Sequence, residues 1–268
     1  MASMVPSSAT PLDPTTIDSD TRGAQVFGLL FRGGDTCKVE SYPQLSCMLP
    51  FVRSFGCNAF LFDLDGVLVD STAVVERIWS EWAERRGIEA ERIMEVAHGR
   101  RTLETIRLVA PELDAEAETT ELERLEVENL DSVLAVEGAL ELISSLPHDG
   151  WTVVTSGPRA LAARRLEHTG LPVPDHFITA EDVEEGKPHP EAYLKGAEIL
   201  DVSPESCVVI EDAPSGIQAG KAAGMTVVAV ATTHDRDELS GADAVVNSLM
   251  EIGVSTGSRM HFELRLPE

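Results

Sequence analysis

Two aspartates, Asp63 and Asp65, stand at the end of a short apolar run, at a spacing that could serve chemistry. The stretch "FLFDLDGVLVDS" (60–71) places apolar or aromatic residues before them and Gly66 directly after Asp65. Carboxylates this close repel each other, which raises their pKa values or destabilises the fold unless a cation joins them. Such oxygen ligands suit Mg²⁺, which commonly bridges carboxylates to phosphate groups. The pair therefore predicts a site where a magnesium ion and a phosphate meet.

Three later segments also place polar residues after apolar runs. These residues are Thr155, Ser156 and Gly157 in "VVTSG", Lys187 in "GKPHPE", and Glu211 and Asp212 in "IEDAPSG". In an open parallel sheet, ligands bind beyond the carboxyl ends of the strands, so we expect these residues at one edge. There a carboxylate could attack phosphorus and form an aspartyl phosphate, while the metal and Lys187 neutralise the phosphoryl oxygens. The combination is typical of phosphoryl transfer.

Smaller groups would complete this chemistry. The Thr155 hydroxyl can donate a hydrogen bond to the phosphate, as can the backbone amides around Ser156 and Gly157. Gly66 permits a tight turn, which would keep Asp65 close to the leaving oxygen as a general acid.

The elements that must position these residues follow from the apolar pattern. From residue 59 onward, short apolar runs alternate with helical stretches, which indicates a parallel sheet covered on both faces, an α/β doubly wound fold. The expected strands are 59–62, 151–155, 176–179, 207–211 and 226–230. The gap between the first two is too long for an ordinary crossover. The sequence therefore predicts an insertion there.

The insertion has a helical pattern. Val75, Ile78, Trp79 and Trp82 recur at helical spacing on one face, and Gly87 follows as a stop signal. We expect an α-helical cap at 72–137, with the tryptophans in its core. The core domain would then comprise 51–71 and 138–250, and residues 251–268 would form a C-terminal tail.

Composition limits the range of partners. The chain has 268 residues, and its 46 acidic against 21 basic residues give a net charge of -25. This charge repels nucleic acid and anionic membrane surfaces. There is no apolar run of roughly 20 residues and no secretory signal pattern. We expect a cytoplasmic protein, a monomer or weak dimer, whose partner is a small phosphorylated metabolite.

The N-terminal part differs from the rest of the chain. Residues 1–50 begin with a stretch rich in Ser, Thr, Pro and Asp, which predicts a disordered extension. Met48 directly precedes the regular pattern, so translation could also begin there. The four cysteines, at 37, 47, 57 and 207, show no CxxC spacing and are expected to be reduced thiols.

Four segments together resemble a known family. "DLDGVLVDS", "VVTSG", "GKPHPE" and "EDAPSG", in this order, resemble the four motifs of phosphatases of the haloacid dehalogenase superfamily, whose Rossmann-like core carries an inserted cap. The resemblance covers about 59–233. It implies that Asp63 is the nucleophile and Asp65 the acid and base. It also implies the two sets of ligands that follow. Mg²⁺ would be held by the Asp63 carboxylate, the Asp65 backbone carbonyl and Asp212, with support from Glu211, and the phosphoryl group by Thr155, Ser156, Gly157 and Lys187.

The cap resembles that of yeast-type glycerol phosphate and 2-deoxyglucose 6-phosphate phosphatases. The likeness includes "HGRRT" (98–102), whose His98, Arg100 and Arg101 are candidate substrate contacts. Arg101 is favoured because an acidic protein needs local cations to receive a phosphate ester. The resemblance implies a phosphatase of small sugar or polyol phosphates.

Other readings fit the motifs less well. The main alternative is a β-phosphoglucomutase, which uses the same aspartyl phosphate but returns the phosphate to a sugar. Haloacid dehalogenases lack the metal and the second aspartate, so Asp65 and Asp212 argue against that activity. An inactive relative that only binds would typically have lost one of the key positions, and none is lost here.

Overall fold

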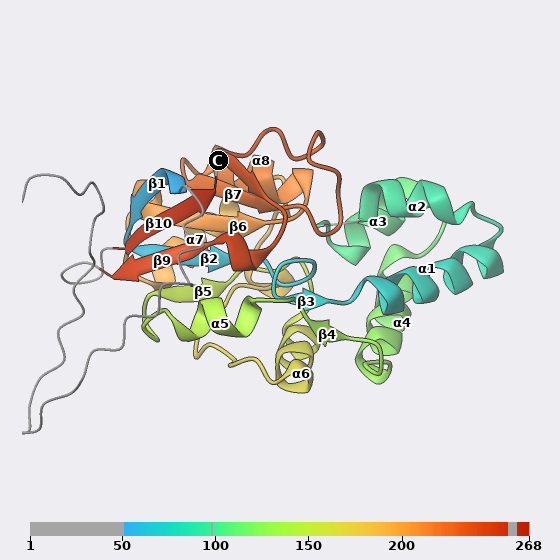
Figure 1. Ribbon diagram of the computed structural model, residues 1–268. Helices are drawn as coiled ribbons and strands as arrows, with labels where there is room; N and C mark the ends of the chain where they lie inside the picture. The colour runs from blue at the N-terminus through green and yellow to red at the C-terminus, as the bar shows by residue number, and fades with distance from the viewer. Residues whose placement is uncertain (1–50, 98, 257–261, 268) are drawn as a thin grey trace, which may run out of the picture. The chain divides into compact units, whose positions relative to one another are not determined.

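A five-stranded parallel sheet forms the centre of the described chain, as the sequence predicts for an α/β doubly wound fold (Figure 1). The computed structural model describes residues 51–97, 99–256 and 262–267. The expected N-terminal extension and Met48 lie outside this range. In spatial order the strands are β5 (Trp151–Val153), β2 (Ala59–Phe62), β6 (Cys207–Glu211), β7 (Thr226–Val230) and β8 (Ala244–Val246).

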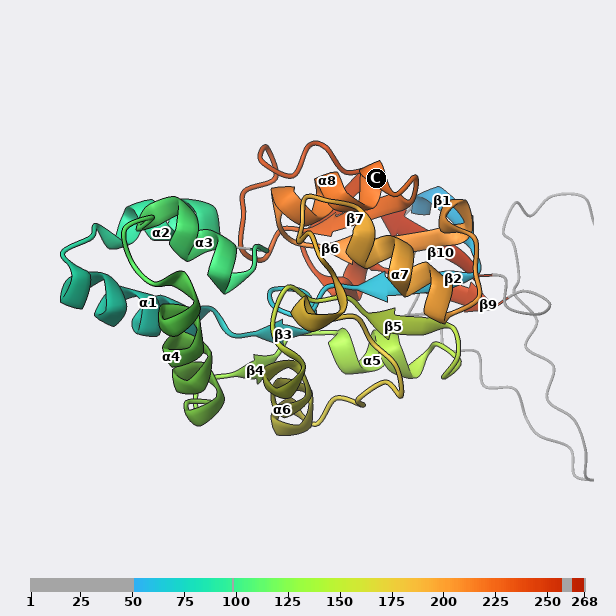
Figure 2. The same cartoon turned by 180° about the vertical axis from the view of Figure 1, so that it is seen from behind.

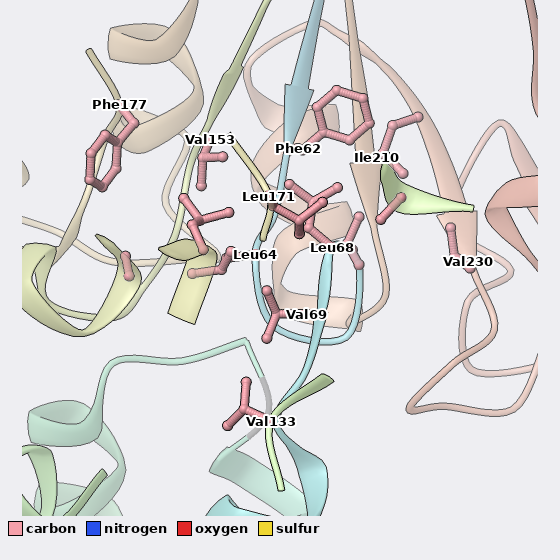
Figure 3. Packing of buried hydrophobic residues seen from close by; sticks show 14 of the residues in the cluster. Phe62, Leu64, Leu68, Val69, Val133, Val153, Leu171, Phe177, Ile210 and Val230 are labelled. Carbon is pink, nitrogen blue, oxygen red and sulfur yellow. The ribbon is translucent and has the colours of Figure 1, made fainter. Parts of the chain in front are cut away.

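Helices cover both faces of this sheet because its strands are apolar on both sides. Phe60 and Phe62 lie in one buried cluster, and Ala59 and Leu61 lie in the other, so alternate residues of β2 face opposite layers. The flanking helices are α5 (Ala139–Ser144) and α6 (Arg159–Thr169) in the first layer, and α7 (Glu191–Ile199) and α8 (Pro214–Ala222) in the second. Figure 3 shows Phe62 of β2 among residues of the first cluster.

Most expected strands are observed, but one is not. Strands 59–62, 207–211 and 226–230 have the predicted bounds, whereas β5 ends two residues early. The expected strand at 176–179 was wrong: this segment forms a single bridge, between Val154 and Ile178. The cause lies at Thr179, whose amide and hydroxyl donate to the Asp182 carboxylate (2.8 and 2.7 Å) and start the 3-10 turn η1 (Ala180–Asp182).

The segment 72–137, assigned to a cap, contains four helices between two short paired strands. These elements are β3 (Val69–Asp70), α1 (Thr72–Arg86), α2 (Ala90–Ala97), α3 (Thr102–Val109), α4 (Ala115–Glu128) and β4 (Leu134–Ala135). Trp79 and Trp82 are buried, with ring centroids 5.6 Å apart in an edge-on arrangement. Figures 1 and 2 show the four helices grouped beyond β3 and β4.

The C-terminal part differs from the expected tail. It contains η3 (Leu249–Glu251), β9 (Gly253–Thr256) and β10 (Phe262–Pro267). Elsewhere in the chain, one more 3-10 turn, η2 (Pro204–Ser206), precedes β6. β10 pairs antiparallel with both β9 and the N-terminal strand β1 (Phe51–Cys57). The pairing joins segments far apart in the chain, so local pattern could not reveal it. Among the described residues, no helix has the length and apolarity needed to cross a membrane.

Candidate active site

Side chains from several strand ends meet at one edge of the parallel sheet. Asp63 follows β2, Thr155 follows β5 by two residues, and Glu211 is the last residue of β6. Lys187 arrives from the loop before α7 and reaches the same place. The structure thus brings together residues from all four segments that the sequence singled out, three of them at the ends of parallel strands that share one edge.

Lys187 lies at the centre of a buried charge cluster. Its ammonium donates to Asp63 Oδ1, to Glu211 Oε1 (2.7 Å) and to the carbonyl oxygen of Val154 (3.2 Å), and the residue is only 1 % exposed. Burial opposes its charge, but Asp63 and Glu211 more than offset this effect and raise the pKa of Lys187 well above its usual value. The charged form of this ammonium is therefore stabilised beside Asp63.

Glu211 fixes this ammonium rather than facing the pocket. Its Oε1 accepts from Lys187 and from the Tyr193 hydroxyl (2.9 Å), and its Oε2 accepts from the amides of Asp212 (2.9 Å) and Ala213 (3.0 Å). Burial raises the pKa of Glu211, but Lys187 and these hydrogen bonds outweigh burial, so the net shift is downward. Both oxygens are occupied, which fits a supporting role behind the other carboxylates.

Three carboxylates could share a cation. One oxygen from each of Asp63, Asp212 and the supporting Glu211 lies within 4.8 Å of the other two. Burial raises the pKa of Asp63 to about 7, and burial together with the charges of Glu211 and Asp63 raises the pKa of Asp212 well above its usual value. A divalent cation would stabilise the charged forms of these groups, so the residues present fit a hard metal ion.

Gly66 allows the second aspartate to turn toward this cluster. Its φ is +84°, and a Cβ at this position would lie 2.0 Å from Asp212 Oδ2. Asp65 Oδ1 accepts hydrogen bonds from Ser71 Oγ (2.7 Å) and Arg165 Nη1 (2.8 Å). The glycine is therefore required by both the backbone conformation and the close approach of Asp212.

The segment after β5 lines the same pocket. Thr155 Oγ1 accepts the amide of Gly157 (3.0 Å), while Ser156 Oγ donates to the carbonyl oxygen of Gly99 (2.9 Å). Ser156 thus connects the core to the segment that precedes α3. Of the four residues of the predicted phosphate site, Thr155, Ser156 and Gly157 line the pocket, whereas Lys187 is not among its lining residues.

The pocket measures about 100 Å³ and lies between the strand ends and the inserted helices. Asp63, Asp65 and Asp212 line it together with Val75, Trp79 and Arg100 of the 72–137 segment. Arg100 donates to the carbonyl oxygen of Val96 (3.2 Å). It is therefore one predicted cap residue that reaches the pocket.

The other two cap candidates are placed differently. Arg101 is not among the described residues that line this pocket: it pairs with Glu104 and donates to the carbonyl oxygens of Glu184 (3.0 Å) and Val183 (3.4 Å). His98 lies outside the described residues.

Several residues that line this pocket were not predicted from the sequence, among them Arg165 and Glu126. Arg165 follows Leu161 by four positions and Ala162 by three, so it falls on the apolar face of α6. An arginine within an apolar stripe was the available signal, since charged residues are almost never fully buried unless paired.

Comparison with known proteins agrees with this geometry. A family model described as haloacid dehalogenase-like hydrolase matches residues 57–224. The chain is 44 % identical over 204 residues to hexitol phosphatase A of Escherichia coli, covering 74 % of this chain and 94 % of that protein. It is 40 % identical over 215 residues to glycerol-1-phosphate phosphohydrolase 2 of Saccharomyces cerevisiae, covering 75 % of this chain and 86 % of that protein.

The fold comparison points the same way. The structure of β-phosphoglucomutase from Clostridium difficile superposes with a TM-score of 0.63 at 26 % identity, covering 72 % of this chain and 92 % of that chain. The matched family range includes the whole acidic cluster and Lys187. The resemblance seen in the four segments is thereby confirmed, and the chain belongs to the haloacid dehalogenase-like hydrolases.

Proposed function

We propose that this protein is a Mg²⁺-dependent phosphatase that hydrolyses small sugar or polyol phosphates through an aspartyl phosphate on Asp63. The observation that carries this proposal is the buried Asp63 carboxylate, held by Lys187 next to Asp212 at the pocket edge. A carboxylate fixed beside one permanent cation and one metal-binding carboxylate is suited to attack a phosphoryl group.

The residues would act in two steps. Asp63 attacks phosphorus, the bond from phosphorus to the ester oxygen breaks, and Asp65 protonates the leaving alcohol. Asp65 then removes a proton from water, which attacks the phosphorus and releases inorganic phosphate and free Asp63. Lys187, the Thr155 hydroxyl and the amides around Ser156 and Gly157 would hold the phosphoryl oxygens throughout.

Mg²⁺ would be held by the Asp63 carboxylate, Asp212 and the Asp65 backbone carbonyl, with Glu211 behind them. When bound, the ion supplies positive charge that compensates the phosphoryl oxygens. The raised pKa values of Asp63 and Asp212 support this assignment, because a cation would remove the cost of charging both groups.

The substrate class is supported by the relatives and by the pocket. The two relatives are named for a hexitol phosphate and for glycerol 1-phosphate, and they are 44 % and 40 % identical to this chain. The mutase is 26 % identical, so the phosphatase is the better-supported activity. A pocket of about 100 Å³ with Arg100 in its wall suits a small anionic ester.

A panel of phosphate esters tests this function. We expect the purified protein with Mg²⁺ to release inorganic phosphate from a hexitol phosphate or from glycerol 1-phosphate, and EDTA to abolish the release. Asp63→Asn should lower turnover by several orders of magnitude because the attacking charge is lost. Asp70→Asn is the matched control: Asp70 is exposed and accepts the Thr72 amide (3.1 Å), a bond that asparagine can also accept.

Two outcomes would contradict the proposal. One is the absence of phosphate release from every ester by the wild type, or wild-type turnover by Asp63→Asn. The other is isomerisation of β-glucose 1-phosphate that requires a bisphosphate activator, which would indicate the mutase. Three expectations from the sequence stay predictions: a cytoplasmic location, a monomeric or weakly dimeric state, and no affinity for nucleic acid.

A further inference from the structure

Arg165 is a buried arginine that bonds two carboxylates from different parts of the fold. It lies on α6 and is 3 % exposed. Its Nη1 donates to Asp65 Oδ1 (2.8 Å), and its Nη2 donates to Glu126 Oε2 (2.8 Å). Glu126 belongs to α4 of the inserted segment and is itself buried. One guanidinium thus connects the loop after β2 with an inserted helix.

Burying the charged Arg165 costs free energy, so its two ion pairs are needed to compensate its charge. Burial opposes the charge on Arg165, but Asp65 and Glu126 more than offset this effect and raise its pKa. Arg165 Nε is buried and has no hydrogen-bond partner in the described part of the chain. The two carboxylates are therefore what holds the guanidinium in place, and loss of either would leave a buried charge poorly compensated.

The bond also fixes how Asp65 faces the pocket. Ser71 and Arg165 both donate to Oδ1, and within residues 51–97, 99–256 and 262–267 no donor bonds to Oδ2. Asp65 lines the pocket and its side chain is 31 % exposed. With Oδ1 anchored by two donors, Oδ2 is the oxygen left to exchange a proton with a ligand.

We propose that Arg165 is a positioning residue for Asp65, and that Glu126 makes this positioning depend on the packing of α4 against α6. The inference rests on the proposed phosphatase function, in which Asp65 protonates the leaving alcohol. A proton donor must lie within hydrogen-bond reach of the leaving oxygen, so its orientation affects the rate directly.

The leaving group separates this role from general support of the fold. A polyol leaves as a strongly basic alkoxide unless it is protonated, whereas p-nitrophenolate is a stable anion that leaves without a proton. A misplaced Asp65 should therefore slow the hydrolysis of a polyol phosphate far more than that of p-nitrophenyl phosphate.

The test compares kcat and KM for glycerol 1-phosphate and p-nitrophenyl phosphate with Mg²⁺. We expect Arg165→Met to lower kcat for glycerol 1-phosphate by at least about tenfold, within the range for general acid catalysis. The kcat for p-nitrophenyl phosphate should change by less than about threefold, and KM should change little for either ester. Glu126→Gln should shift the ratio of the two kcat values in the same direction by a smaller factor.

Matched controls lie next to both residues. Arg164 is the exposed neighbour of Arg165 on α6, so Arg164→Met makes the same chemical change outside the pocket. Glu128 pairs with Arg124 on the exposed side of α4 (2.6 Å), so Glu128→Gln controls for Glu126→Gln. Both controls should keep the wild-type ratio of the two kcat values.

Non-additivity gives a second readout. If Arg165 acts through Asp65, the double variant Asp65→Asn with Arg165→Met should be no slower on glycerol 1-phosphate than Asp65→Asn alone. Should Arg165→Met fail to fold, Arg165→Lys and Glu126→Gln replace it in the same comparison, since both keep a polar group at the buried position.

Several results would overturn the inference. Equal loss of kcat on both esters, a raised KM with unchanged kcat, or an additive double variant would each assign Arg165 to the fold or to substrate binding. Wild-type protein that releases phosphate from neither ester nor from a hexitol phosphate would instead refute the phosphatase function itself.

Discussion

Gly216, in the first turn of α8, shows how tightly single residues define the site. A Cβ at this position would lie 1.5 Å from Glu211 Oε1, the atom that bonds Lys187 and Tyr193. The only ways to admit a methyl group are to move the Glu211 carboxylate or to shift the helix. A glycine outside the catalytic positions is therefore needed to keep Lys187 in place.

We predict that Gly216→Ala impairs both activity and stability. Displacing Glu211 should break its bonds to Lys187 and lower kcat by at least about tenfold, as loss of one electrostatic contact typically does. Overpacking should reduce the free energy of unfolding by about 1–3 kcal/mol and thereby lower the Tm by several degrees. Enzyme assays and thermal unfolding measure both effects. Gln218→Ala, on the exposed side of the same helix, is the control, and wild-type behaviour of Gly216→Ala would show that the site relaxes freely.

At the scale of elements, hydrogen bonds connect α3 and the residue before it to the loop that carries Lys187. Arg101, directly before α3, donates to the carbonyl oxygens of Val183 and Glu184, and Glu104 of α3 accepts the amide of Gly186 (3.3 Å). These bonds join a helix of the inserted segment to the residues just before Lys187. The arginine expected to contact substrate instead holds two elements together in this structure.

We therefore predict that Arg101→Ala raises KM for glycerol 1-phosphate and p-nitrophenyl phosphate alike, by about three- to tenfold, because two or more hydrogen bonds between the elements are lost. Arg107→Ala is the control, since Arg107 lies on the same helix and pairs with Glu116 at the exposed surface (2.6 Å). Steady-state kinetics measures the change. A rise of KM for glycerol 1-phosphate alone would assign Arg101 to substrate contact, as first expected from the sequence.

At the scale of the whole molecule, the ends of the described chain meet in one antiparallel sheet of order β1-β10-β9. β10 lies between the other two strands, so removing β1 would expose a row of its unpaired backbone groups. Residues 51–57 therefore belong to the folded protein, although no catalytic motif includes them.

Two shortened chains test this view. A chain that begins at Met48 keeps every described residue. Its kcat should stay within about twofold, and its Tm within about 2 °C, of the values of the full protein. A chain that begins at Asn58 lacks β1 and should unfold at a lower temperature and aggregate more readily, because the β10 edge is exposed. Thermal unfolding and light scattering measure the difference. An inactive or insoluble Met48 chain would show that residues 1–47 are needed.

The sequence by itself determined what depends on neighbours in the chain. The spacing of Asp63, Asp65 and Gly66, the apolar runs of β2, β6 and β7, and the helical period of α1 are all local, and each was predicted from its own residues. Because parallel strands must end at one edge, these local patterns were also enough to bring Asp63 and Asp212 to the same place.

Only the tertiary structure decided which distant groups meet. Arg165 bonds Asp65, which is 100 residues away in the chain, and Glu126, which is 39 residues away. The periodicity of α6 and α4 does not predict either partner. The same holds for the pairing of β1 with β10 and for the contact of Arg101 with the Lys187 loop. The wrong prediction of a strand at 176–179 has a related cause. The apolar pattern of this segment fits a strand, but the hydrogen bonds of Thr179 to Asp182 turn the chain away from the sheet. Local patterns encode elements, whereas the partners of buried polar groups are set by packing between elements.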